Sequence, residues 1–202
     1  ATYTYAILKD MIWVVGSPGY ASATLIDPAT GAESTVTVNT IDGGAATFAG
    51  WTSGTANTAP AYNVTGFTST FGEVSNDGKY NTLYNGYGLY RVETLANGKV
   101  NLDGYQTIGY RHATDVDTKA TFFVGENGHN VYVDDATIFT VRTAKVGGGW
   151  EYKQYVGKAN VPSFVAGTVR AFYVTNADTD VYADYVYIKE GTLDYAGNAY
   201  VV

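Results

Sequence analysis

The chain has 202 residues and a formal net charge of −7, with 19 acidic and 12 basic residues, and it contains no cysteine. The absence of cysteine excludes disulfide bonds, thiolate nucleophiles and Cys-ligated zinc. The basic residues are scattered singly and the longest apolar runs are short, so we expect neither a nucleic-acid partner nor membrane insertion.

The N-terminal region predicts strands separated by a turn. Residues 2–9 favour a strand, and a second apolar run, 11–15, follows Asp10. The Gly and Pro residues of 16–19 then break the chain.

The next segment predicts a β-hairpin. Residues 22–26 and 34–41 are rich in strand-forming side chains, and Pro28 and Gly31 between them are typical of a hairpin loop. In the second of these strands valine alternates with threonine and asparagine. That alternation indicates one face in the core and the other in water.

The remainder of the chain continues the same pattern. Residues 42–60 are rich in Gly, Ala and Thr and form the least regular segment. Turn signals typical of hairpins follow between β-prone runs at 76–78, 97–98, 127–128 and 147–149. No apolar pattern of helical period persists for three turns, so the sequence predicts an all-β protein with mostly antiparallel sheets.

The stretch 168–189 gives the most detailed prediction. Two runs dense in Val, Tyr, Phe and Ile flank the polar residues 176–180, which indicates two strands joined by a tight turn. The second strand carries apolar groups on both faces. We therefore expect a central strand, with Val186 and Ile188 on the core side and Asp184 at the edge of the core.

Polar residues accumulate at 111–119, and this segment is the expected join between two modules. We predict two small β-barrels or β-sandwiches in tandem, 1–110 and 111–202. The halves show no strict internal repeat.

Several stretches of the chain together form a recognisable pattern. They are TIFTV at 137–141, YKQYVGKANVPSF at 152–164 and RAFYVTNADTDVYADYVYIKEG at 170–191, preceded by YAILKD at 5–10, TLIDPATGAESTVTV at 24–38 and SNDGKYNTL at 75–83. The later stretches resemble the repetitive β-rich regions of S-layer-homology-domain proteins of Gram-positive bacteria, and the earlier ones look like the module that often precedes those regions. The resemblance implies an extracellular, wall-associated or S-layer protein whose modules act as spacers or display units. It carries over no catalytic residue, and the helical wall-anchoring motif that names these proteins is missing from this sequence.

Pairs of acidic residues are the candidate metal ligands. Asp115 with Asp117, and Asp178 with Asp180, place carboxylates two residues apart, a spacing that lets a turn wrap a hard cation such as calcium. Neither segment has the glycine and the bidentate glutamate of an EF-hand loop, so solvated turn acids are the alternative. No cofactor other than calcium is expected.

Catalytic residue types are scarce. His112 and His129 each have an isolated, turn-like neighbourhood and are expected on the surface. The sequence has no G-x-S-x-G motif, so a serine triad is not predicted. Any two of the 19 acids could meet as a glycosidase pair by chance, and we expect no enzyme.

Tryptophans in loops are the candidate ligand-binding residues. Trp13 is expected in the core, whereas Trp51 lies in a Gly/Thr-rich loop and Trp150 follows three glycines. An exposed aromatic side chain on a loop indicates recognition, and flat aromatic faces stack on sugar rings. Trp51 and Trp150 are therefore the candidate ligand-binding residues.

Together these observations predict a non-enzymatic structural or spacer module of a bacterial cell-surface or S-layer-associated protein, located in the cell wall or S-layer. Its partners would be other modules of the same surface protein, neighbouring copies, and cell-wall or host glycans. The alternative is a carbohydrate-binding module or adhesin domain that uses its loop aromatics, and a glycoside-acting enzyme is the third reading.

Overall fold

The computed structural model describes residues 2–14, 16–41, 43–46, 48–51, 62–64, 89–103, 110–114, 120–124, 130–175 and 182–194. Every regular element among these residues is a β-strand, which confirms the all-β prediction. Within the described chain no helix is long and apolar enough to cross a bilayer. The expected turns at 76–78, 127–128 and 176–180 lie outside the described residues.

The chain divides into two compact units. Unit 1 comprises Ala1–Asp27, Ala32–Tyr105 and Ala144–Trp150, and unit 2 comprises Pro28–Gly31, Gln106–Thr143 and Glu151–Val202. The expected modules were 1–110 and 111–202, and they differ from these units chiefly in the two short turns that group with the other unit. The division into two modules at 110/111 stays a prediction.

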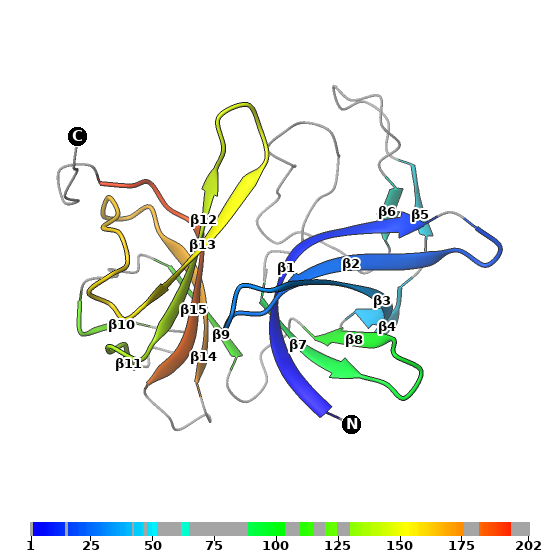
Figure 1. Ribbon diagram of the computed structural model, residues 1–202, viewed down its shortest axis with the longest axis horizontal. Helices are drawn as coiled ribbons and strands as arrows, with labels where there is room; N and C mark the ends of the chain where they lie inside the picture. The colour runs from blue at the N-terminus through cyan, green and yellow to red at the C-terminus, as the bar shows by residue number, and fades with distance from the viewer. Residues whose placement is uncertain are drawn as a thin grey trace. The chain divides into compact units, whose positions relative to one another are not determined.

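The described residues of unit 1 form eight strands (Figure 1). They are β1 (Thr2–Val14), β2 (Tyr20–Ile26), β3 (Glu33–Ile41), β4 (Gly44–Ala45), β5 (Phe48–Trp51), β6 (Tyr62–Val64), β7 (Leu89–Thr94) and β8 (Val100–Asp103). Strands β5 and β6 pair with each other as a separate two-stranded sheet.

Five of these strands close into a barrel. Strand β1 pairs with both β2 and β7, β2 also pairs with β3, and β8 joins β3 to β7. All of these pairings are antiparallel except β3 with β8, which is parallel. The closed order β1-β2-β3-β8-β7 is that of a five-stranded Greek-key barrel of the OB type.

The inside of this barrel is a single hydrophobic cluster. Its buried members come from all five barrel strands: Ala6, Leu8, Met11, Ala21, Ala23, Leu25, Val38, Ile41, Tyr90, Val92, Val100 and Leu102. Within most strands these residues alternate with polar ones, because successive side chains of a strand point to opposite faces.

The two hairpins predicted here are present. Strands β2 and β3 pair antiparallel around residues 27–31, where the Asp27 N–H donates to the Ala32 carbonyl (2.9 Å) and Gly31 has φ 79°. Strands β7 and β8 are joined at Asn97-Gly98, and Gly98 has φ 84°. Glycine suits both turns because positive φ is costly for other residues.

The two N-terminal runs lie in one strand. The expected strand 2–9 continues through Asp10 into the apolar run that follows it, so that β1 extends from Thr2 to Val14. Its register with β2 shifts between Leu8 and Asp10, so Lys9 is an extra residue in a β-bulge. The bulge reverses the inward face, from Ala6 and Leu8 before it to Met11 after it.

The described residues of unit 2 form seven strands (Figure 1). They are β9 (Tyr110–Thr114), β10 (Phe122–Val124), β11 (Asn130–Tyr132), β12 (Ile138–Ala144), β13 (Trp150–Val156), β14 (Arg170–Thr175) and β15 (Ala183–Glu190). Five form a sheet in the order β13-β12-β15-β14-β9, and β10 pairs with β11. Strands β12 and β13 are joined at Gly147-Gly148-Gly149, the turn expected from the sequence.

Strand β15 is central, as predicted. It pairs with β12 on one side and with β14 on the other. Val186 and Ile188 belong to the buried cluster of unit 2 and are 1% and 0% exposed, whereas Asp184 is exposed. The cluster also contains Phe123, Val131, Val133, Phe139, Val141, Val161, Val169, Ala171, Tyr173 and Ala183.

Candidate functional site

Three aromatic side chains form a surface row across adjacent strands of unit 2. Phe122 of β10 and Tyr132 of β11 are cross-strand partners with ring centroids 5.3 Å apart. Tyr132 in turn forms an isolated parallel bridge with Tyr182, just before β15, and their ring centroids are 5.6 Å apart. We call Phe122, Tyr132 and Tyr182 the aromatic strip.

The strip is exposed because each ring occupies the outward position of a strand. Phe122 and Tyr182 are 41% and 49% exposed, and Tyr132 is half-buried. Their chain neighbours Phe123, Val131, Val133 and Ala183 are instead buried in the core. Side chains of a strand alternate between its faces, so the buried neighbours hold the three rings on the outside.

The buried ring of Phe123, the chain neighbour of Phe122, packs against the main sheet. Phe123 packs edge-on against Tyr173 of β14, with centroids 5.5 Å apart. Edge-to-face aromatic pairs are stabilised by about 1 kcal/mol beyond the area they bury. Strand β10 is therefore tied to the main sheet by the residue next to Phe122.

Exposed polar residues lie close in the chain to two rings of the strip. Asn130 and Asp134 lie two residues to either side of Tyr132, and Asp184 lies two residues beyond Tyr182; all three are exposed. Asn130 lies in β11 and, at two-residue spacing from Tyr132, on the same face of that strand. Asp134 lies in the turn after β11, and Asp184 is the extra residue of a bulge in β15.

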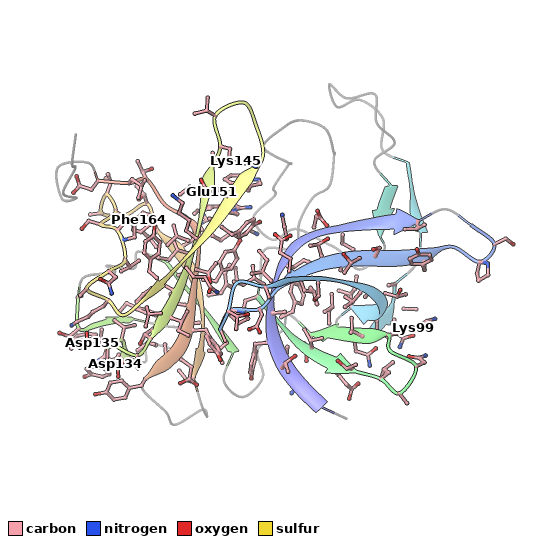
Figure 2. All side chains as sticks on the ribbon, in the orientation of Figure 1. Lys99, Asp134, Asp135, Lys145, Glu151 and Phe164 are labelled. Carbon is pink, nitrogen blue, oxygen red and sulfur yellow. The ribbon has the colours of Figure 1, made fainter. Side chains whose placement is uncertain are left out.

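Asp134 is held in a defined turn after β11 (Figure 2). Its Oδ1 accepts hydrogen bonds from the N–H groups of Ala136 (2.9 Å) and Thr137 (3.1 Å). The Thr137 hydroxyl, which is buried, donates to the Ala183 carbonyl (3.1 Å) at the start of β15. This turn therefore fixes the position of Asp134 relative to the strand that follows Tyr182.

A second polar array covers the outside of the unit 1 barrel. Asn39 donates from Nδ2 to Oδ1 of Asn101 (2.9 Å), and Asn101 donates from Nδ2 to Oε1 of Glu93 (2.7 Å). Arg91 of β7 and Asp103 of β8 form an ion pair, with N and O 3.2 Å apart. The members of this array satisfy one another, as expected for a solvated sheet face.

The predicted tryptophans fall in different parts of the chain. Trp51 ends β5, and its side chain lies outside the described residues. Trp150 begins β13 and is half-buried. Ligand binding by these two residues stays a prediction.

The predicted acidic pairs and His129 lie outside the described residues. His112 lies in β9, and its side chain is also outside the described residues. Among the residues that are described, no three His, Asp or Glu side chains come together in a way that could hold a metal. Calcium binding by Asp115, Asp117, Asp178 and Asp180 therefore stays a prediction.

Sequence reasoning did not find the aromatic strip. Strands β10 and β11 are only three residues long, and Phe122-Phe123 is apolar on both faces. Alternation over so short a run does not say which ring is outside. Within these two short strands only Tyr132 carried a usable signal, since tyrosine tolerates exposure better than the valines 131 and 133 on either side of it.

Comparisons with protein-family models, with curated proteins and with solved structures gave no match to this chain. The geometry of the described residues is therefore the basis of any functional argument.

Proposed function

We propose that this chain is a non-enzymatic structural module of an extracellular bacterial surface protein, acting as a spacer or display unit in the cell wall or S-layer. Its partners are other modules of the same protein and neighbouring copies. The resemblance of several stretches to β-rich regions of S-layer-homology-domain proteins supports this proposal.

The observation that carries the proposal is that each compact unit has its own hydrophobic core. The cluster of unit 1 is drawn from the five barrel strands, and the cluster of unit 2 from its main sheet together with β10 and β11. A spacer outside the cell must stay folded without a ligand, and buried apolar surface is the main source of that stability. The closed barrel of unit 1 also leaves fewer strand edges open to unwanted pairing.

Surface location is tested by adding protease to intact cells of the source organism. We expect the protein to be cleaved or released without lysis, while a cytoplasmic marker remains intact. Protection until the cells are lysed would contradict the proposal.

The non-enzymatic character is tested with the purified chain and a panel of polysaccharides, peptides and esters. No turnover is expected. Reproducible hydrolysis that is abolished by a single Asp or Glu substitution would overturn this part of the proposal.

A second candidate function is glycan recognition, in which the module is a carbohydrate-binding or adhesin domain for cell-wall or host glycans. The observation that favours it is the aromatic strip, because adjacent exposed rings offer flat faces against which sugar rings can pack. Retention of the purified chain on an immobilised glycan, released by the same glycan in solution, would support it. Failure to bind any member of a broad glycan array would contradict it.

A further inference from the structure

We propose that the aromatic strip is a stacking platform for one neutral, β-1,4-linked glycan chain of the glucan or N-acetylglucosamine type, lying across β10, β11 and the start of β15. This inference rests on the second proposed function, glycan recognition, and names its site and its ligand class. The platform is Phe122, Tyr132 and Tyr182.

The chemistry of the rings selects the ligand. An aromatic face carries negative charge density and attracts weakly positive C–H groups. A pyranose with all its ring substituents equatorial presents only axial C–H groups on each face. Such sugars joined by β-1,4 bonds form an extended chain, so successive sugar faces can lie on successive rings.

The size of the strip favours a glycan over a protein partner. Phe122 and Tyr182 are 41% and 49% exposed, and an aromatic side chain has an area of roughly 200 Å², so the strip offers about 200 Å² of ring surface. Each side of a stable protein interface buries about 800 Å². The strip by itself is too small to form such an interface.

The charges beside the strip favour a neutral ligand. In the described segments 120–124, 130–137 and 182–185 every charged residue is an aspartate: Asp134, Asp135 and Asp184. Their carboxylates repel anionic polymers such as uronic-acid chains. They accept hydrogen bonds from sugar hydroxyl groups, and Asn130 can both donate and accept.

The angles between the rings favour a single free chain over a flat crystalline surface. The planes of Phe122 and Tyr132 differ by 47°, and those of Tyr132 and Tyr182 differ by 37°. A flat polysaccharide crystal can contact only one such ring fully. A single glycan chain can rotate from sugar to sugar and follow the tilted row.

The test is titration calorimetry of the full chain with soluble hexasaccharides. β-1,4-Linked glucose and β-1,4-linked N-acetylglucosamine hexamers distinguish the two sugar types. An α-1,4-linked glucose hexamer and a β-1,4-linked hexamer with carboxylated sugars serve as comparators. We expect one β-1,4-linked neutral hexamer to bind, and both comparators and crystalline cellulose to bind at least about tenfold more weakly.

Variants then locate the site. Tyr182→Ala and Phe122→Ala remove exposed rings and should each weaken binding roughly tenfold, whereas Tyr182→Phe keeps the ring and should retain most of the affinity. Tyr20→Ala is the matched control, because Tyr20 is 44% exposed and lies in unit 1. Its affinity should equal that of the unaltered chain. Far-ultraviolet circular dichroism and melting temperature confirm that each variant is folded.

The possible failures are separable. If neutral hexamers bind but Tyr182→Ala and Phe122→Ala bind equally well, the strip is not the site and glycan recognition still stands. If no glycan binds, both the inference and the second proposed function are wrong. Concentration-dependent self-association of the unaltered chain that Tyr182→Ala abolishes would show a protein contact instead and overturn the inference.

Discussion

At the scale of single residues, backbone positions that only glycine tolerates determine how the turns of unit 2 pack. Gly157 has φ 84°, its N–H donates to the Thr137 carbonyl (2.8 Å), and a Cβ built on it would lie 3.0 Å from the Asp135 carbonyl oxygen. The next N–H, that of Lys158, donates to the Asp134 carbonyl (3.2 Å). The residues that follow β13 are thus hydrogen-bonded to the turn that contains Asp134.

Gly157→Ala should lower the free energy of unfolding by about 2–4 kcal/mol, because positive φ costs about 1–2 kcal/mol for alanine and crowding of the Asp135 backbone adds to it. Gly167→Ala is the matched control. Gly167 has φ 78° with nothing within 4 Å of the built Cβ, so only the cost of about 1–2 kcal/mol for positive φ is expected. Urea unfolding measures both variants, and equal losses would show that the contact with Asp135 has no energetic weight.

At the scale of elements, polar bulge residues decide which face of a strand is buried. Lys9 in β1, Asn39 in β3 and Asp184 in β15 each stand as an extra residue where the pairing register shifts. At each of these residues, the buried positions of the strand change from even to odd residue numbers or from odd to even. A bulge places two residues opposite one, so at these three positions the polar side chain leaves the inward face and the apolar pattern resumes one residue later. A second register shift in β15 differs, because its extra residue, Lys189, is buried.

In β15 this explains a pattern that simple alternation does not. Ala183, Val186 and Ile188 all face the core, although 183 is an odd residue number and the other two are even. The register runs from Val174↔Tyr185 to Thr175↔Ala183, which leaves Asp184 as the extra residue. The exposed position of Asp184 beside Tyr182 is a product of that bulge.

Val186→Asp should lower the free energy of unfolding by about 3 kcal/mol or more, since it places an unpaired charge in a position that is 1% exposed. The melting temperature should fall by on the order of 10 °C. Val146→Asp is the same chemical change at a residue that is fully exposed and should shift it by no more than about 2 °C. Thermal unfolding followed by circular dichroism measures both, and equal shifts would contradict the placement of β15 in the core.

At the scale of the whole molecule, the two separate hydrophobic clusters predict two regions of independent stability. Hydrogen exchange of Val186→Asp tests this without cutting the chain. Amides of β12, β14 and β15 should lose protection, while those of β1, β2 and β3 keep theirs. Equal loss of protection in both units would show that the chain unfolds as one cooperative body.

Calcium binding by the acidic pairs is also expected to act on the whole molecule. A site of the affinity usual for extracellular modules should add about 1–2 kcal/mol of stability at about 5 mM calcium, because only the folded state binds the ion. The melting temperature should rise by a few degrees with calcium and less with magnesium, and chelator should reverse the rise. Asp115→Asn with Asp117→Asn, and separately Asp178→Asn with Asp180→Asn, identify which pair is responsible. An unchanged melting temperature in calcium would mark all four as solvated turn residues.

The sequence by itself determined the all-β class, the hairpins at 27–31, 97–98 and 147–149, and the central place of β15. These depend on local chemistry: strand-forming runs, turn residues that tolerate positive φ, and apolar side chains on both faces of the strand that contains Val186. The tertiary structure alone decided the closure of β1 against β7, the parallel pairing of β3 with β8, and the alignment of Phe122, Tyr132 and Tyr182. Those contacts join residues far apart in the chain, and the pairing of β3 with β8 also contains a single-residue bulge that local alternation does not reveal.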